Sequence, residues 1–375
     1  MRVLQIDSGR EWRGGQNQVR LLCRELAREP GIDVRLVTGS RSELARRAIA
    51  DGVAVLEVPW RFSVDFRATN ALSNAVLAFK PHIVHAHDSH ALRLSVGVRD
   101  YYGRYSGLLA FISSGWRALS ESPPTVVGTR RVDFHLRRRR GLARLLAGDS
   151  PWSRADYVIA ISEAVKRMLV ADGLAPTEIS VVPDGIDPDE VRRAAEPPLD
   201  ARAHLGLPAG TPLAVNVAAL VDHKDQRTLI RAAQHARAAR PDLHWVIAGE
   251  GELRGSLAAE IARLGLSDRV HLLGYVERAD ALIRESDVFV MSSKEEGLGS
   301  VILNALALGK PVVATAAGGI PEILPAAALV PVGDAAALAR KVVGALERPS
   351  PVPLPPQFTA AAMAQGVLAL YRSLL

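Results

Sequence analysis

The sequence predicts two α/β domains, each built on a doubly wound parallel sheet. The chain has 375 residues, more than the roughly 250–300 at which a single core stops growing. Short β-branched, apolar runs alternate with amphipathic segments almost from end to end, which is typical of parallel sheets covered on both faces. One loosely patterned, Pro-rich segment, 192–212, interrupts the alternation and is the expected linker.

The first half contains a regular series of strands and helices. Strands are expected at 3–7, 33–38, 53–58, 82–87, 125–129 and 157–162, and a further strand begins at 180 and ends in a Pro/Asp/Gly cluster. Helices are expected at 16–29, 42–50, 68–79 and 163–171. The segment 98–122 breaks this rhythm and is aromatic-rich in a chain that is 5% aromatic, so we interpret it as an insertion that is mobile or faces a substrate.

The second half repeats the alternation. Strands are expected at 213–219, 244–248, 270–275, 288–292, 311–315 and 328–331, with helices at 225–239, 253–264, 278–285, 300–308 and 334–347. A proline hinge at 350–357 precedes a last apolar helix at 358–374.

The expected domains are therefore residues 1–192 and 193–355, with a C-terminal helix, 356–375, that returns to the N-terminal domain. Open α/β sheets bind ligands beyond the carboxyl ends of their strands. Two such sheets facing each other predict a ligand in the cleft between the domains.

Composition favours a cytoplasmic protein. Cys23 is the single cysteine, which excludes an internal disulfide and a cysteine-based zinc site and fits a reducing compartment. Asp7 interrupts the first apolar run too early for a signal peptide. No apolar run reaches the roughly 18 residues that would indicate a membrane-spanning helix.

The net charge of +6 is placed unevenly. Residues 1–190 hold 27 Lys and Arg against 22 Asp and Glu, a net of +5, and include Arg130, Arg131 and the run Arg137–Arg140. Two interpretations stay open: attraction to an anionic membrane surface or lipid phosphate, and a solvated arginine-rich face. Nucleic acid is not an expected partner, because the chain lacks spaced Cys/His ligands and an aromatic-basic RNA-binding motif.

The most informative stretch is 292–322. A strand ends at Ser292, an acidic turn containing Glu296 follows, and a helix begins near Ser300. The backbone amides of Leu298, Gly299 and Ser300 are expected at the positive end of that helix, where a phosphate is favoured. This context predicts a functional role for Glu296, which alone would be an ordinary surface carboxylate.

Several motifs in sequence order carry a family resemblance. The run EEGLGSVILNALALGKPVVATAAGGIPEIL resembles the carboxyl-terminal signature of the retaining GT-B glycosyltransferases of group 1, or family four. The segment 9–27 is similar to the amino-terminal glycine loop and helix of that family. Further matches follow in order: VIAISEAVKRML, VVPDGID, NVAALVDHKDQRTLIRAA, WVIAGEGELRGSL and DRVHLLGYV. The resemblance covers nearly the whole chain and implies two Rossmann-like domains that face each other.

The resemblance also implies roles for individual residues. Glu296 matches the glutamate that contacts hydroxyls of the donor sugar, and Lys224 matches the basic residue that neutralises the charge of the leaving diphosphate. The second family glutamate, which grips the ribose, falls on Asn304. The arginine that accompanies the lysine falls on Ala219. If Asn304 occupies the ribose position, Asn304→Glu is expected to tighten nucleotide binding or leave it unchanged.

Other donor-binding positions follow from the same match. The loop that faces the donor phosphates contains Gly14 and Gly15, and the segment whose backbone reads the nucleobase contains Tyr275 and Val276. The acidic turn and the start of its helix contribute Gly297, Leu298, Gly299 and Ser300, and a loop near the donor contributes Glu322. On the acceptor side, His87 ends a strand, and Arg130 and Arg131 stand where the family often has a histidine.

The resemblance implies transfer of a sugar from a nucleotide-diphosphate donor, most often UDP-linked, to a hydroxyl of a glycan, lipid-linked or lipopolysaccharide-type acceptor. No cofactor or metal is expected, because Lys224 and helix-end amides can offset the diphosphate charge and no DxD-like pair stands on a turn. A sugar-nucleotide epimerase and a non-catalytic nucleotide-sugar-binding protein stay open as alternatives. A NAD-dependent oxidoreductase is disfavoured because no G-x-G-x-x-G follows the first strand.

Overall fold

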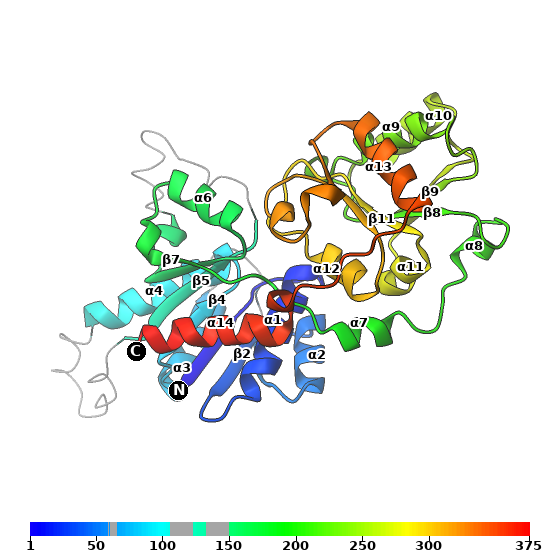
Figure 1. The fold of residues 1–375 in the computed structure, drawn as a ribbon. Coiled ribbons are helices and arrows are strands. Elements are labelled where there is room, and N and C mark those ends of the chain that lie inside the picture. The colour runs from blue at the N-terminus through cyan, green and yellow to red at the C-terminus, as the bar shows by residue number, and fades with distance from the viewer. Residues whose placement is uncertain (59, 61–65, 106–122, 133–149) are drawn as a thin grey trace. The chain divides into compact units, whose positions relative to one another are not determined.

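The computed structural model describes residues 1–58, 60, 66–105, 123–132 and 150–375. The chain divides into two compact units, Met1–Gly185 with Ala360–Leu375, and Ile186–Thr359. The expected boundary at 192 lies farther along the chain than the observed one. Each unit contains one sheet of parallel strands with helices, as the alternating pattern predicts (Figure 1).

Unit 1 is built on a seven-stranded parallel sheet in the order β3-β2-β1-β4-β5-β6-β7. Its strands are β1 (Arg2–Ile6), β2 (Asp33–Gly39), β3 (Ala54–Val58), β4 (Ile83–Ala86), β5 (Thr125–Arg130), β6 (Tyr157–Ala160) and β7 (Ile179–Val181). Its α-helices include α1 (Gly14–Ala27), α2 (Glu43–Ala50), α3 (Phe66–Phe79), α4 (Ser89–Tyr105), α6 (Glu163–Ala171) and α14 (Ala360–Ser373).

Helix α14 completes the core of unit 1 although it is the last element of the chain. Its buried side chains Met363, Val367 and Leu368 pack in one cluster with Leu22 and Leu26 of α1. Figure 1 shows α14 beside α1, at the opposite end of the sequence. Burial of such side chains contributes about 1.5–3 kcal/mol each, so truncation of α14 would expose a face of this sheet's core.

Unit 2 is built on a six-stranded parallel sheet in the order β10-β9-β8-β11-β12-β13. Its strands are β8 (Leu213–Val217), β9 (His244–Ala248), β10 (Val270–Gly274), β11 (Val288–Met291), β12 (Val312–Thr315) and β13 (Leu329–Val330). Its α-helices are α7 (Pro188–Ala194), α8 (Ala201–His204), α9 (Gln226–Ala236), α10 (Arg254–Arg263), α11 (Ala279–Glu285), α12 (Ser300–Ala307) and α13 (Ala335–Glu347).

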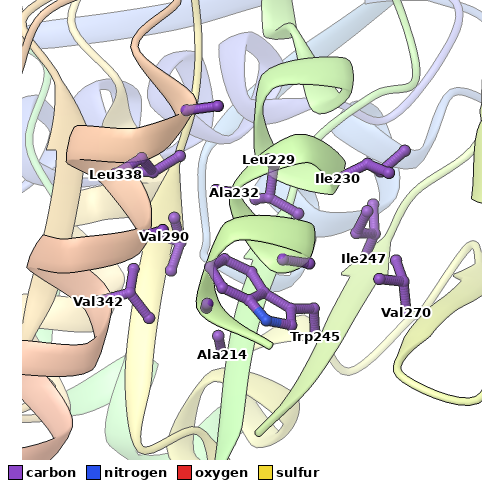
Figure 2. Packing of buried hydrophobic residues seen from close by; sticks show 14 of the residues in the cluster. Ala214, Leu229, Ile230, Ala232, Trp245, Ile247, Val270, Val290, Leu338 and Val342 are labelled. Atoms are coloured by element: carbon purple, nitrogen blue, oxygen red, sulfur yellow. The ribbon is translucent and has the colours of Figure 1, made fainter. Parts of the chain in front are cut away.

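Strand β9 shows why the second sheet is covered on both faces. Trp245 and Ile247 belong to one buried cluster, whereas Val246 and Ala248 belong to another. Successive strand residues point to opposite faces, so a continuous apolar run requires helices on both sides. Figure 2 shows Trp245 among side chains of α9 (Leu229) and α13 (Val342).

Two segments differ from their sequence interpretation. Helix α4 extends through the first part of 98–122, and 106–122 lies outside the described residues. The segment 192–212, the expected linker, contains the end of α7 and all of α8. The Glu285 carboxylate organises it by accepting hydrogen bonds from the amides of Leu199, Asp200 and Ala201, the last at 2.6 Å.

The strand order reverses once in each sheet, between β1 and β4 and between β8 and β11. Loops that follow the two strands at such a switch point leave in opposite directions and expose the carboxyl edge of the sheet, where open α/β sheets bind ligands. Lys224 follows β8 and Glu296 follows β11. The switch point of unit 2 therefore carries both predicted catalytic side chains.

Candidate functional site

Lys224 and Glu296 form an ion pair across the switch point of unit 2, with Lys224 Nζ donating to Glu296 Oε2. Lys224 ends the short turn Asp222–Lys224. Asp225 then caps α9, its carboxylate accepting from the Thr228 backbone amide at 3.4 Å and from the Thr228 hydroxyl at 2.7 Å. The side chains of Lys224 and Glu296 are only 17% and 13% exposed. Since little water screens them, their attraction is stronger than that of an exposed surface pair.

Hydrogen bonds hold the two loops that carry this ion pair. The Ser292 hydroxyl donates to the carbonyl of Lys224 at 3.0 Å, and the Ser293 hydroxyl donates to the Glu296 carboxylate at 3.2 Å. The Glu296 carbonyl in turn accepts a 2.9 Å bond from the Gly319 amide, in the loop after β12. Three strand ends thus fix the geometry of one carboxylate and one amine.

Helix α12 begins beside Glu296, and its first residue is Ser300. Gly299, at φ +87°, occupies the left-handed region, and a Cβ there would lie 3.4 Å from Glu296 Cγ. No side chain caps the helix start and no acidic residue lies in its first turn. The positive end of the helix dipole therefore stands next to the ion pair, as the glycine-containing turn predicts.

Glycines after β9 bring a second loop close to the Lys224 loop. A Cβ on Gly249, at φ +146°, would lie 1.9 Å from the carbonyl oxygen of Ala218. A Cβ on Gly251 would lie 2.3 Å from the carbonyl oxygen of Leu220. Only glycine permits this approach, so both glycines support the backbone that precedes Lys224.

Asn304 bonds to an acidic residue that sequence reasoning did not single out. Its side-chain amide donates to Asp280 Oδ1 at 2.7 Å, which joins α12 to the first turn of α11. Burial and the nearby charge of Glu190 raise the pKa of Asp280, and the Asn304 bond opposes that rise. Tyr275, at the end of β10 and before this turn, is 70% exposed.

In unit 1, a chain of hydrogen bonds runs inward from Arg131. Arg131 Nη1 lies 3.2 Å from His87 Nδ1, and His87 Nε2 lies 2.7 Å from Gln5 Oε1. The Gln5 amide donates to the Tyr371 hydroxyl at 2.9 Å, and Tyr371 lies 2.6 Å from His85 Nδ1. His85 Nε2 completes the chain at the Thr129 hydroxyl, 2.6 Å away.

The donor and acceptor roles along this series of hydrogen bonds follow from its first donor, Arg131. A guanidinium can only donate, so His87 Nδ1 accepts and His87 Nε2 carries the proton that Gln5 Oε1 accepts. The Gln5 amide nitrogen then donates to Tyr371, and Tyr371 donates to His85. Burial keeps both imidazoles neutral, lowering the pKa of His85 to about 3 and that of His87 well below its usual value.

Arg131 is held from a second side by Asp184, with Nε 3.1 Å from Oδ1. It lies close to the start of α1, since a Cβ on Gly15 would be 3.9 Å from Arg131 Cδ. Helix α1 begins at Gly14 without a side-chain cap. Arg130 has a different environment, with its guanidinium carbon 5.3 Å from the centre of the Trp152 ring.

The structure thus groups many of the predicted residues. Within unit 2, contacts connect Lys224 and Glu296 to the turn that contains Gly297, Leu298, Gly299 and Ser300. Within unit 1, Gly15, His87 and Arg131 lie together. Val276 packs against a buried cluster, and Glu322 lies in the turn Ile320–Glu322. The run Arg137–Arg140 lies outside the described residues.

Sequence reasoning missed Asp184, Gln5 and Tyr371. A polar residue within an apolar strand, as Gln5 is in VLQI, was the available signal for a buried hydrogen-bond partner. Nothing local distinguishes Tyr371 from an ordinary helix residue. In the parts of the chain that the structure describes, no three His, Cys, Asp or Glu side chains gather as a metal site would require. Within the same ranges, no helix combines the length and apolarity needed to cross a membrane.

Two family profiles match the chain in succession. The profile described as Glycosyltransferase Family 4 matches residues 12–190, and the one described as Glycosyl transferases group 1 matches residues 199–363. A 2-deoxystreptamine glucosyltransferase of Streptomyces kanamyceticus is 31% identical over 207 residues, 53% of this chain and 53% of that protein. The lipopolysaccharide core biosynthesis glycosyltransferase LpsE of Rhizobium meliloti is 35% identical over 144 residues, 38% of this chain and 41% of that protein.

The matched regions thus span about half the length of these curated relatives. Among solved structures, Anabaena HepE in complex with UDP and glucose superposes with a TM-score of 0.72 at 18% identity. The superposition covers 100% of this chain and 95% of HepE. At this identity the likeness shows the fold, which is the GT-B arrangement of two parallel-sheet units with helices.

Proposed function

This chain belongs to the group 1 and family 4 glycosyltransferases, and we propose that it transfers a sugar from a nucleotide-diphosphate donor to an acceptor hydroxyl with retention at the anomeric carbon. The observation that carries the proposal is the Lys224–Glu296 ion pair at the switch point of unit 2, beside the start of α12. This arrangement places one cation, one carboxylate and the backbone amides of a helix start at one edge of the sheet, where they can bind the phosphates and hydroxyls of a nucleotide sugar.

In the proposed reaction, the bond between the anomeric carbon and the diphosphate breaks while the acceptor oxygen bonds to that carbon from the same face. The acceptor proton passes to a departing phosphate oxygen, so no covalent enzyme intermediate is required. Negative charge grows on the diphosphate during departure. Lys224 and the amides at the start of α12 stabilise that charge, and Glu296 orients Lys224 and accepts hydrogen bonds from sugar hydroxyls.

We expect no metal ion to be needed, because these groups can offset the diphosphate charge. UDP is the nucleotide we propose, and the HepE complex with UDP and glucose is consistent with that choice for a protein of the same fold. Transfer activity that survives excess EDTA would support the metal-free reaction. Full loss on chelation, with recovery on addition of magnesium or manganese, would refute it.

Unit 1 is the proposed acceptor side, where Arg131 is the cation best placed to meet an anionic acceptor group. Asp184 and His87 fix its guanidinium from two directions. The name of the LpsE relative is consistent with a lipopolysaccharide-type or lipid-linked acceptor for this chain as well. Arg131→Gln is expected to raise the KM for such an acceptor.

We also propose reversible docking at an anionic membrane surface through the basic excess of residues 1–190. Each Lys or Arg near such a surface contributes about 1 kcal/mol, and salt screens the attraction. Flotation with anionic and neutral liposomes, each at low and high salt, tests this part alone. Recovery with anionic liposomes at low salt supports docking, and equal recovery with both lipids excludes it.

A panel of UDP, GDP, ADP and their sugars, read by thermal shift, identifies the donor without requiring an acceptor. The stabilising sugar nucleotide is then incubated with candidate acceptors, and NMR of the product reports the anomeric configuration. Transfer with retention supports the proposal. Free UDP with an epimerised sugar and no acceptor requirement would indicate an epimerase, and binding without turnover would indicate a non-catalytic binding protein.

A further inference from the structure

The contact between Asp280 and Asn304 lies beside the proposed donor site but has no part in the reaction described above. Asp280 is in the first turn of α11 and Asn304 is in the second turn of α12, and 2.7 Å separates Asp280 Oδ1 from Asn304 Nδ2. No lysine or arginine among the described residues pairs with Asp280, whose interacting groups are Asn304 and Glu190. Asp280 is half-buried.

The position of the pair relative to the helix start is informative. Ser300 and Asn304 are four residues apart in α12, so they share one helix face and lie about 5–6 Å apart at Cβ. Asn304 is therefore one turn away from the amides proposed to bind a phosphate. On the other side, a short connection from the exposed Tyr275 leads directly to Asp280.

Three kinds of group thus follow one another in space: the backbone amides at the start of α12, the Asn304–Asp280 pair, and the exposed aromatic ring of Tyr275. A nucleoside diphosphate presents phosphates, then a ribose with two vicinal hydroxyls, then a flat base. The hydroxyls need hydrogen-bond acceptors in a site of low water content. Asn304 alone offers one carbonyl oxygen, whereas a carboxylate offers two oxygens and accepts stronger bonds.

We infer that Asp280 is the residue that accepts a hydrogen bond from a ribose hydroxyl of the donor nucleotide, and that Asn304 positions its carboxylate. This inference rests on the proposed function, since it requires a nucleotide in unit 2. Burial and Glu190 act against ionisation of Asp280, and the Asn304 amide favours the charged, accepting form. The carboxylate that binds the ribose is thus supplied by Asp280 on α11, whereas the family resemblance places a glutamate at the position of Asn304.

The pair reverses the expectation for Asn304→Glu. A glutamate at 304 would place a second carboxylate beside Asp280 and remove the amide that stabilises it, so like charges would compete for one site. Asn304→Glu should therefore weaken nucleotide binding. The reciprocal exchange D280N/N304E keeps one carboxylate and one amide in contact, and it should recover binding that the single change loses.

The test measures binding of UDP, 2′-deoxy-UDP and 3′-deoxy-UDP by titration calorimetry, without an acceptor. The wild-type protein should prefer UDP over at least one deoxy analogue by roughly tenfold or more, the range for a hydrogen bond to a charged group. Asp280→Asn should weaken UDP roughly tenfold, leave that analogue nearly unchanged and so lose the preference. D280N/N304E should restore at least part of it.

Glu277→Gln is the matched control, because it removes one exposed negative charge from the same connection. It should keep the ribose preference. A preference that survives Asp280→Asn, or equal weakening of all three nucleotides with a lower melting temperature, would show that the pair only joins α11 to α12. If the thermal-shift panel identifies a nucleotide other than UDP as the donor nucleotide, the deoxy analogues of that nucleotide replace those of UDP in this test. Failure of every nucleotide to bind the wild-type protein would instead refute the proposed function itself.

Discussion

Lys224 and Glu296, 72 residues apart in the sequence, form an ion pair between the loops that follow β8 and β11. Those two strands are neighbours in the sheet, and the strand order reverses between them. The pair is therefore a consequence of topology. Because β8 and β11 are parallel neighbours, the loops that follow them start at the same edge of the sheet, and each loop contributes one residue there. A bound diphosphate would compete with Glu296 for the Lys224 ammonium, and a sugar would compete with Lys224 for the Glu296 carboxylate.

Glu296→Gln should lower turnover at least tenfold while leaving the fold intact. The amide keeps the shape and one accepting oxygen, but it loses the charge that orients Lys224 and strengthens hydrogen bonds to a sugar. Turnover and melting temperature are measured together. Glu295→Gln, at the exposed neighbouring position, is the control and should retain activity. Near wild-type turnover of Glu296→Gln with a proven donor would remove Glu296 from the site.

Lys224→Met should lower kcat by about a hundredfold or more, the usual effect of removing one group that stabilises charge in the transition state. Methionine fills a similar volume without charge, although it removes the ammonium that contacts the Glu296 carboxylate. Lys224→Arg restores the charge and should recover part of the loss. Steady-state kinetics of the two variants separate charge from packing, because loss of charge predicts that Arg exceeds Met and a packing role predicts no such order.

Asp7 gives unit 1 a pH-dependent stability of predictable sign. Burial, and then the charge of Asp88, raise the pKa of Asp7 from 3.8 to about 6. The folded state therefore holds its proton more tightly than the unfolded state, and the wild-type protein loses stability relative to Asp7→Asn as the pH rises from 3.8 through about 6. The shift of about 2 pKa units corresponds to roughly 3 kcal/mol, constant at higher pH.

Urea unfolding of the wild-type protein and Asp7→Asn across this pH range measures the effect. The free energy of unfolding of the wild-type protein, relative to that of Asp7→Asn, should fall as the pH rises. A difference that does not change with pH would show that Asp7 titrates normally in the folded state. Asp172→Asn, which changes an aspartate at the end of α6, is the comparison variant.

Tyr371→Phe should destabilise unit 1 by about 1–3 kcal/mol, because it leaves the Gln5 amide and His85 Nδ1 buried without their partner. The hydroxyl is the only group removed, so the aromatic packing of α14 stays in place. Tyr157→Phe removes a less buried hydroxyl that lies 3.2 Å from Ser180 and should cost less. Equal melting temperatures for both variants would contradict a structural role for the inner hydrogen-bond chain.

The sequence predicted most elements of the fold because hydrophobic periodicity is local. The expected strand at 288–292 and helix at 300–308 correspond to β11 (Val288–Met291) and α12 (Ser300–Ala307). The turn between them also predicted where Glu296 and the α12 amides would lie. Its physical signals, glycine and a strand-to-helix change of period, are contained within a few residues.

Contacts between distant residues could not be predicted in this way. Asp280 and Asn304 lie 24 residues apart, and His85 and Tyr371 lie 286 residues apart. Neither pair has a pattern that a window of sequence reveals, since each depends on which helices the sheet brings together. The same holds for Glu285, which accepts bonds from the start of α8 and gives structure to a segment that composition alone suggests is a linker.

Titration of the stabilising sugar nucleotide into the wild-type protein and Lys224→Met, both in excess EDTA, tests most directly whether unit 2 binds a donor diphosphate at the switch point without a metal. We predict saturable binding at one site per chain in the wild-type protein and at least tenfold weaker binding in Lys224→Met, because one charge-assisted contact to the diphosphate is lost. Equal affinities for the two proteins, or binding that appears only when a divalent metal is added, would contradict the proposed site.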